Sequence, residues 1–178
     1  NLAGAQWIAQ LMGVDASDFY EAIPSFTGAS KRLECLSRGQ TSILFKDFAH
    51  APSKVKATAQ ALKSQFTSHR IHVCLELHTY SSLDPSFIEQ YKDTLEVADE
   101  ALVFYDPEAL KIKNRAPIDA DTIKKAFNHS SMKVISKTSI LTEELLAQNF
   151  SNRVIVMMSS GNFGGIDWEE LKQRINEF

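Results

Sequence analysis

Apolar positions follow two different periods along this chain. From Ile43 onward, short continuous aliphatic runs alternate with segments in which apolar residues recur every three to four positions. A continuous aliphatic run of about four to eight residues is typical of a strand covered on both faces, and the second spacing is typical of an amphipathic helix. Alternating strands and helices build a parallel sheet with right-handed crossovers. The pattern therefore predicts an α/β domain with helices on both faces of a sheet.

Five aliphatic runs predict the parallel strands, and a hairpin adds one more. The runs are ILFKDF, RIHVCLEL, ALVFY, MKVIS and RVIVMM. Before the first of them, two β-type runs flank Arg38-Gly39-Gln40, which is typical of a tight antiparallel hairpin. We therefore expect a three-layer, Rossmann-like fold with a mostly parallel six-stranded sheet and one antiparallel edge strand.

Helix-start signals and apolar stripes predict where the helices lie. A proline in the first turn and an Asp, Ser or Thr before it are typical of a helix N-terminus. The expected helices are one with the stripe Val55, Ala59, Leu62 and Phe66; one opened by Asp84-Pro85 and carrying Phe87, Ile88, Tyr91 and Leu95; one around Thr122–Phe127; one from Thr142; and one capped by Asp167 with Glu170.

The amino-terminal segment has a different character. Residues 2–12 have helical apolar spacing, Gly13 follows as a helix-ending glycine, and Asp15 opens a second short helix that ends before Pro24. The chain starts inside a helical pattern and without an initiator methionine. We therefore expect residues 1–26 to be the helical end of an upstream domain, and residues 27–178 to form the α/β domain.

Composition narrows the classes of partner. The formal net charge is −3, which gives no basic footprint for nucleic acid. No run approaches the roughly 18 apolar residues that span a bilayer, and no signal peptide opens the chain. The two cysteines, Cys35 and Cys74, are expected to be reduced, packed thiols. These features predict a cytoplasmic protein that binds neither nucleic acid nor membrane.

Four loops follow the carboxyl ends of the predicted strands, where open α/β sheets bind their ligands. They are Asp47–Pro52, Glu76–Pro85, Tyr105–Pro117 and Ser159–Gly165. In the first, Pro52 and the extended conformation that it imposes on Ala51 make the loop stiff. Asp47 could then bind a ribose hydroxyl, and His50 could stack on a base or donate to a phosphate. Alternatively, Asp47 caps the following helix and His50 packs on the surface.

The other loops carry weaker signals. Glu76 and His78 are too few for a metal site, so no metal is expected. The Gly-rich stretch MSSGNFGGIDW favours a close approach to an anionic group or a tight turn over an NAD site, because it lies in the last βα unit. No G-x-x-x-x-G-K-[ST] phosphate loop and no G-x-S-x-G elbow occurs in the sequence. His72 is expected to be structural.

Five segments, taken in order, resemble the carboxy-terminal domain of the Mur ligases, ATP-dependent enzymes that assemble the peptidoglycan stem peptide. FTGASKRLE resembles the family's F-x-G-x-x-R-R-x-E, and DFAHAP resembles D-Y-A-H-x-P. ELHTYSSL and ADEALVFYDP follow with the family's spacing. The ending MSSGNFGGI is similar to the murein peptide ligase branch, which attaches a tripeptide to UDP-N-acetylmuramate.

The resemblance implies a reaction and a set of site residues. ATP phosphorylates a muramoyl carboxylate, and an amine attacks the acyl phosphate, with Mg²⁺ and the phosphate grip held mainly by the absent central domain. No catalytic residue is expected in this chain, and the fragment alone is expected to be inactive. The implied nucleotide-binding residues are Arg32, Asp47 and His50; the implied substrate-binding residues are His78, Ser81, Ser159, Ser160, Gly161 and Asn162.

Alternatives and departures accompany the resemblance. The leading hypothesis joins L-Ala-γ-D-Glu-meso-diaminopimelate to UDP-N-acetylmuramate. The alternatives are a UDP-N-acetylmuramate–L-alanine ligase domain and a non-catalytic α/β nucleotide-binding module. Lys31 stands where an arginine is common, and YDPEAL lacks the arginine with which relatives read diaminopimelate. Lys111, Lys113 and Arg115 are the candidates to replace that arginine. The implied partners are UDP-N-acetylmuramate, an amino acid or peptide, and the upstream central and amino-terminal domains.

Overall fold

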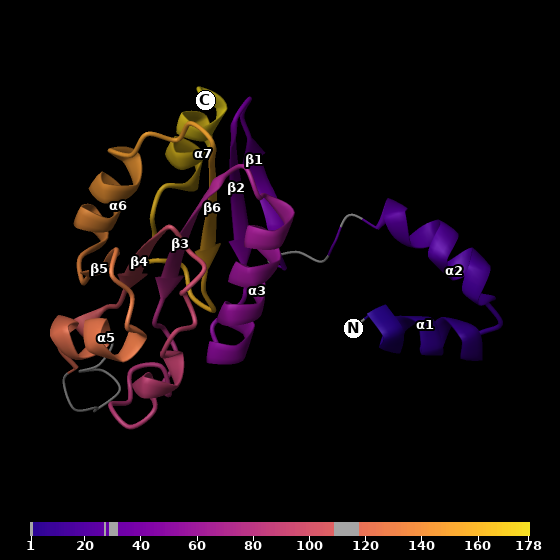
Figure 1. The fold of residues 1–178 in the computed structure, drawn as a ribbon, viewed down its shortest axis with the longest axis horizontal. Coiled ribbons are helices and arrows are strands. Elements are labelled where there is room, and N and C mark those ends of the chain that lie inside the picture. The colour runs from indigo at the N-terminus through magenta and orange to yellow at the C-terminus, as the bar shows by residue number, and fades with distance from the viewer. Residues whose placement is uncertain (1, 27, 29–31, 109–117) are drawn as a thin grey trace.

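A six-stranded sheet forms the centre of the α/β domain (Figure 1). The computed structural model describes residues 2–26, 28, 32–108 and 118–178. The strands are β1 Glu34–Arg38, β2 Ser42–Asp47, β3 Arg70–Glu76, β4 Glu100–Phe104, β5 Met132–Ile135 and β6 Arg153–Met158, in the sheet order β1-β2-β6-β3-β4-β5. The edge strand β1 pairs antiparallel with β2, and every other pairing is parallel. The predicted fold class and sheet are confirmed.

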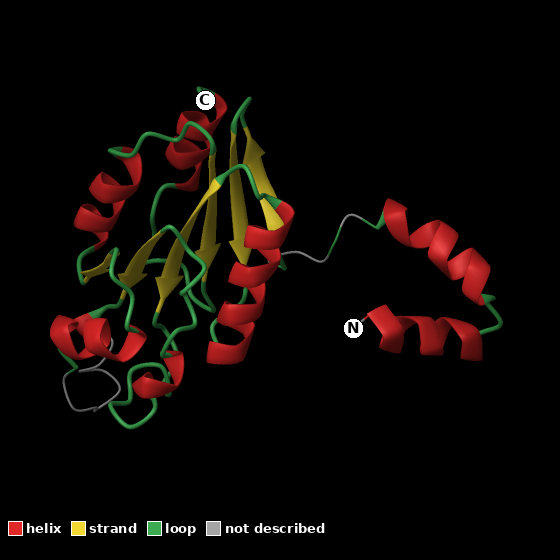
Figure 2. Cartoon of the chain, in the orientation of Figure 1, coloured by secondary structure: helices red, strands yellow, loops and turns green. Residues whose placement is uncertain are grey.

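Helices cover both faces of this sheet, as Figure 2 shows. The elements on one face are α3 Pro52–Gln65, the 3₁₀ helix η2 Ile88–Tyr91 and α5 Ala120–Phe127; those on the other are α6 Thr138–Leu146 and α7 Trp168–Asn176. Successive strand residues point to opposite faces, so Val73 and Leu75 belong to one core and Cys74 to the other. Two-sided burial explains the continuous aliphatic strand pattern.

The carboxyl terminus is fixed against the β1–β2 hairpin. The backbone N–H and the hydroxyl of Thr41 both donate to the carbonyl of Phe178, over 2.7 and 2.8 Å. The Ser42 hydroxyl donates to the carbonyl of Ile175 over 2.8 Å. A Cβ atom at Gly39 would collide with that same carbonyl, so the turn requires a glycine. The predicted hairpin thus also anchors α7.

Two helix predictions are wrong in detail. Asp84 does not open an α-helix: its Oδ1 accepts the backbone N–H and the hydroxyl of Ser86, and only the short 3₁₀ helix η2 follows. Such local side-chain bonds compete with helix formation. Thr142 lies inside α6 rather than at its start, and its hydroxyl donates to the carbonyl of Thr138, the first helical residue. The apolar spacing therefore predicted the buried residues of these segments correctly, but the capping signals did not predict where the helices begin.

Other local predictions have mixed outcomes. Asp167 caps α7, where its carboxylate accepts the backbone N–H groups of Glu169 and Glu170. Cys74 is a buried free thiol, as expected. Cys35 is exposed, so the expectation that both thiols are packed is wrong for this residue. It lies on the edge strand β1, in which no residue is fully buried.

The amino-terminal segment forms two helices and a 3₁₀ turn. These are α1 Leu2–Leu11, α2 Ala16–Ala22 and η1 Ile23–Ser25, and none of their residues is buried. Gly13 follows α1 with φ of 90°, as the pattern predicts. Large apolar side chains, among them Trp7 and Leu11, are mostly exposed. The assignment of residues 1–26 to an upstream domain stays a prediction. Within the described residues, no helix has the length and apolar character needed to cross a membrane.

Candidate functional site

The strand order brings three of the predicted loops together at the carboxyl edge of the sheet. β6 lies between β2 and β3, so the loops after Asp47, Met158 and Glu76 are neighbours. The backbone N–H of Ser159 donates to the carbonyl of Asp47 over 3.0 Å and joins two of these loops directly. Segments more than a hundred residues apart in sequence thus form one continuous surface.

A cleft of about 380 Å³ lies beside the first of these loops. Arg32, Asp47 and His50, the three residues expected to bind a nucleotide, all line it. Lys54 also lines it from the first turn of α3 and was missed by the sequence reasoning. Its signal was present: a lysine two positions after the helix-opening proline lies on the turn next to the loop. Two cationic side chains, a carboxylate and an imidazole therefore share one cleft.

The loop that carries Asp47 and His50 is held by its own hydrogen bonds. Asp47 Oδ1 accepts the N–H of Ala49 over 2.7 Å, and Oδ2 accepts the hydroxyl of Thr58 over 3.4 Å. The N-cap position of α3 is Ala51, so the alternative in which Asp47 caps this helix is wrong. Oδ1 of Asp47 is thus held by a short hydrogen bond, whereas Oδ2 makes only a long contact. Oδ2 is therefore the better acceptor for a ligand.

His50 is positioned from both sides. Its Nδ1 lies 2.8 Å from the carbonyl of Phe48, which can only accept, so Nδ1 carries the proton and Nε2 remains for another partner. The ring of Phe48 packs edge-on against the imidazole at 5.1 Å. The Tyr91 hydroxyl donates to the carbonyl of His50 over 2.5 Å, and burial raises the pKa of Tyr91 to about 12. Tyr91 is therefore a permanent donor that secures the loop.

The second part of the edge is organised around Glu76, which is only 4% exposed. Its Oε2 accepts the hydroxyl of Ser159 and, over 2.9 Å, the backbone N–H of Phe163. The Ser159 oxygen in turn accepts the N–H of Gly161 over 2.6 Å. Sequence reasoning did not place Glu76 among the site residues. A carboxylate at the last position of a buried strand was the available signal, because a buried charge requires several partners.

The predicted substrate-binding residues are only partly brought together. Ser159 and Gly161 lie next to the Glu76 carboxylate. His78 is about half exposed, and its Nδ1 lies 3.7 Å from Glu76 Oε1. Ser81 is exposed and contacts Thr79 in its own loop, with 3.3 Å between the two hydroxyl oxygens. The structure therefore joins the Ser159 loop to His78 and leaves Ser81 outside this contact network.

The remaining predicted residues of this edge differ in exposure. Asn162 is exposed, and its carbonyl accepts the N–H of Gly165 over 3.1 Å, which closes the turn. The hydroxyl of Ser160 is buried and has no hydrogen-bond partner among the described residues. Lys31, Lys111, Lys113 and Arg115, which the sequence also suggested, lie outside the residues that the structure describes.

We expect Gly161→Ala to lower the free energy of unfolding by about 2 kcal/mol, within the range found for overpacked sites. A Cβ atom at Gly161 would lie 2.7 Å from both Glu76 Oε2 and the His78 ring, so both side chains would have to move. Urea denaturation of the chain measures the change. Gly4→Ala is the matched control, since a Cβ there meets nothing within 4 Å. Equal effects of the two substitutions would contradict the close packing at Gly161.

The fold and this edge define a class: an α/β domain whose polar, partly cationic cleft lies at the carboxyl ends of parallel strands. The model of the family "Mur ligase, glutamate ligase domain" matches residues 31–161. The chain belongs to the Mur ligase family, as the carboxy-terminal domain, which confirms the resemblance seen in the sequence.

Individual relatives agree with this assignment. A UDP-N-acetylmuramate–L-alanine ligase of Caldicellulosiruptor saccharolyticus is 35% identical over 103 residues, which is 58% of this chain and 22% of that protein. The structure of a UDP-N-acetylmuramate-alanine ligase from Thermotoga maritima aligns over 96% of this chain and 34% of that one (TM-score 0.68, 19% identity). A murein peptide ligase from Psychrobacter arcticus aligns over 98% and 36% (TM-score 0.66, 21% identity). The chain therefore matches about a fifth to a third of the length of these proteins.

Proposed function

We propose that this chain is the carboxy-terminal domain of an ATP-dependent ligase that joins L-Ala-γ-D-Glu-meso-diaminopimelate to UDP-N-acetylmuramate in the cytoplasm. The observation that carries the proposal is the common cleft of Arg32, Asp47 and His50, next to the loop that holds Ser159 and Gly161. The ending MSSGNFGGI supports the peptide over a single amino acid as the group added.

The side chains of the cleft fit a nucleotide. Arg32 and Lys54 are exposed cations on the cleft wall and would neutralise phosphate oxygens. Asp47 would accept a ribose hydroxyl, and His50 Nε2 would bind at the base or the ribose. ATP supplies the phosphoryl group that activates the muramoyl carboxylate; the amine of the peptide then displaces phosphate and loses a proton. In this proposal the chain orients the reactants and neutralises charge.

The incoming peptide would meet the other half of the edge. His78 projects from the end of β3 beside the Ser159 loop, where its imidazole could bind a peptide carboxylate. Among the described residues, no group of three or more His, Cys, Asp or Glu side chains could hold a metal ion. In this proposal Mg²⁺ is bound by the nucleotide phosphates and by the central domain of the ligase.

The L-alanine ligase is the second candidate. The relative with 35% identity is named as an enzyme of this kind, and the two structural relatives fit the fold about equally well. Fold similarity at this level does not choose between the two added groups. The third possibility, a non-catalytic nucleotide-binding module, differs from both because it predicts no turnover.

The test uses the full-length protein with ATP, Mg²⁺ and UDP-N-acetylmuramate, and measures phosphate release. L-alanine and L-Ala-γ-D-Glu-meso-diaminopimelate are offered separately. We expect turnover with the tripeptide alone. Turnover with alanine alone would replace the proposal by the second candidate, and none with either would leave the non-catalytic module.

We expect Asp47→Ala to lower kcat/KM for ATP at least tenfold in that assay, because a lost hydrogen bond to a charged group is worth about 1.5–3 kcal/mol. Glu143→Ala is the control, since Glu143 is an exposed carboxylate on α6. The KM for the amine substrate should change little. A loss of the same size in the control, or an unchanged kcat/KM in Asp47→Ala, would contradict the assignment of Asp47 to the nucleotide.

A further inference from the structure

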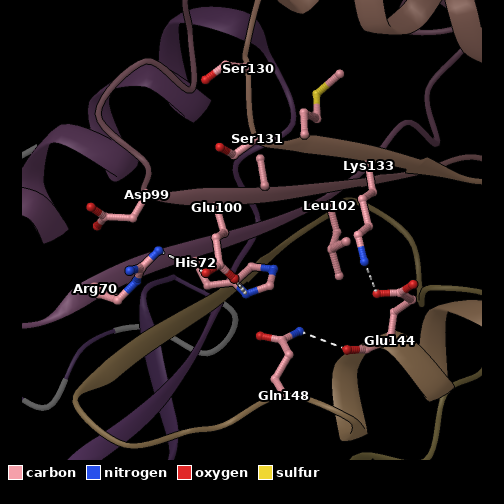
Figure 3. A pocket seen from close by; sticks show the side chains of 12 residues that line it. Arg70, His72, Asp99, Glu100, Leu102, Ser130, Ser131, Lys133, Glu144 and Gln148 are labelled. Atoms are coloured by element: carbon pink, nitrogen blue, oxygen red, sulfur yellow. Dashed lines mark hydrogen bonds and ion pairs between the residues drawn. The ribbon is translucent and has the colours of Figure 1, made fainter.

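The charged side chains around the hollow at the amino ends of β3, β4 and β5 pair with one another, as Figure 3 shows. Glu100 binds Arg70 over 3.0 Å, and Lys133 binds Glu144 over 2.6 Å. Arg32, in the cleft at the carboxyl edge, differs from them, because its side chain has no hydrogen bond or ion pair among the described residues. Its place in that cleft therefore depends on the backbone that carries it.

The next residue, Leu33, has an unusual backbone conformation. It stands directly before β1, and its φ is 46°. This is the left-handed region, which leucine rarely adopts because its Cβ approaches the following carbonyl oxygen. Such a conformation persists only where its surroundings hold it. The Leu33 side chain is half-buried and packs against the core that also contains Val55 and Leu62 of α3. This contact offsets the strain of the turn.

The pairing of β1 with β2 shows which face each residue of β1 occupies. Glu34 lies opposite Lys46, and Cys35 lies opposite Phe45. Directly opposite residues of two antiparallel strands share a face of the sheet. Lys46 Nζ lies 4.1 Å from the centre of the Trp168 ring on α7, whereas Phe45 belongs to the core beneath α3. Glu34 is therefore on the α7 face, and Cys35 is on the α3 face.

An extended conformation at Leu33 would direct Arg32 away from the cleft. Side chains alternate between faces along a strand, so a regular continuation of β1 before Glu34 would put Leu33 on the α3 face and Arg32 on the α7 face. Arg32 instead lines the cleft with Asp47 and with Lys54 of α3. The left-handed turn at Leu33 thus breaks the alternation and brings both residues to the α3 face.

We propose that Leu33 is a positioning residue for the nucleotide: its left-handed conformation holds the Arg32 guanidinium in the cleft, where it binds a phosphate oxygen. This inference rests on the proposed function, in which the cleft binds ATP. The contact of the Leu33 side chain with the core fixes the turn before the nucleotide arrives. Less conformational freedom is then lost when Arg32 binds the phosphate.

A spin label at position 32 measures the direction of this side chain in the 178-residue chain and requires no activity. In the variant Arg32→Cys, Cys35→Ser the label reacts at position 32, because the remaining thiol, Cys74, is buried. We expect paramagnetic broadening of the backbone amide signal to be stronger at Lys54, on the α3 face, than at Trp168, on the α7 face. Stronger broadening at Trp168 would overturn the proposal.

Leu33→Ile and Leu33→Met are the matched variants of this labelled chain, since both keep an apolar side chain of similar size and only isoleucine branches at Cβ. A branched Cβ makes the left-handed region much less favourable. Leu33→Ile should therefore move the stronger broadening to Trp168, whereas Leu33→Met should leave it at Lys54. Broadening that stays at Lys54 in Leu33→Ile would refute the role of Leu33. If that variant does not fold, the labelled chain that keeps Leu33 decides alone.

A double-mutant cycle in the full-length protein tests the consequence for the nucleotide, with the phosphate-release assay. We expect Leu33→Ile to lower kcat/KM for ATP at least about fivefold, and to have no further effect when Arg32 is already replaced by alanine, because Leu33 acts through Arg32. The KM for the amine substrate should not change. A merely structural role of Leu33 would lower kcat/KM equally in both backgrounds, and that result would overturn the proposal.

Arg32→Ala by itself separates this proposal from the proposed function. We expect it to lower kcat/KM for ATP at least about tenfold, because a hydrogen bond to a charged group is lost. An unchanged kcat/KM, or no turnover in the unmodified protein, would refute the nucleotide contact and with it the role of Leu33 in the reaction, even where the spin label confirms the turn. A loss in Arg32→Ala without any loss in Leu33→Ile would refute the role of Leu33 alone.

Discussion

Glu76→Ala is expected to lower the free energy of unfolding by about 3 kcal/mol, because two hydrogen bonds to a buried carboxylate are lost together. The Ser159 hydroxyl and the Phe163 N–H both donate to Glu76 Oε2, and both are buried. Alanine would leave these donors without an acceptor. The Ser159 loop would then lose its fixed position at the carboxyl edge.

Urea denaturation of Glu76→Ala, Glu76→Gln and the exposed control Glu143→Gln separates the causes. Glutamine keeps an acceptor oxygen at this place, so Glu76→Gln should recover about half of the loss, and Glu143→Gln should change the stability by less than about 0.5 kcal/mol. In the phosphate-release assay that tests the proposed function, Glu76→Ala in the full-length protein should also raise KM for the amine substrate. A fully stable Glu76→Ala variant would show that the Ser159 loop is held by other contacts.

Acidification from pH 7 to pH 4 is expected to lower the free energy of unfolding by about 3 kcal/mol through His72 alone. Its pKa in the folded chain is about 4, against 6.5 for the free side chain, and one pKa unit corresponds to about 1.36 kcal/mol. Between these two values the unfolded chain binds a proton that the folded chain does not. Stability is therefore full above about pH 6.5 and falls as the pH decreases toward 4.

The carboxylates near His72 act in a different pH window. The pKa of Glu100 is lowered mainly by the Arg153 hydrogen bond. Burial raises the pKa of Asp99, but the hydrogen bonds from Lys63 and Ile71 together outweigh it and lower this pKa. Their contributions are present above their unfolded pKa of about 4 and are lost only below it. The decline in the free energy of unfolding that His72 causes between pH 6.5 and 4 can therefore be separated from the losses that Glu100 and Asp99 cause at lower pH.

Urea denaturation at several pH values measures this decline in the unmodified chain, in His72→Gln and in His69→Gln. Removing the titrating ring in His72→Gln should flatten the curve between pH 6.5 and 4 by about 3 kcal/mol relative to the unmodified chain. His69, which is only half-buried, is the matched control and should leave the slope unchanged. An identical slope in His72→Gln and the unmodified chain would contradict a lowered His72 pKa.

Much of the fold could be predicted because local pattern and global burial agree. The run RIHVCLEL became β3 because its residues are covered on both faces, and the turn at Gly39 became a hairpin because only a glycine fits beside the α7 carbonyl. The helix predicted after Asp84 is wrong because local pattern and local hydrogen bonding disagree there. Its apolar spacing fits a helix, yet a local bond between Asp84 and Ser86 gives a turn and a 3₁₀ helix instead. The buried positions Ile88 and Tyr91 are the same in either case.

The sequence by itself determined the α/β class, the mostly parallel sheet, the family and the grouping of Asp47 and His50 in one stiff loop. These follow from periodicity, turn residues and short motifs, which are properties of neighbouring residues. Only the tertiary structure decided that Lys54 shares the cleft, that Glu76 holds the Ser159 loop and that His72 faces a hollow with Gln148. Each of these contacts depends on the order of strands in the sheet or on side-chain direction, and neither is encoded at any fixed spacing along the chain.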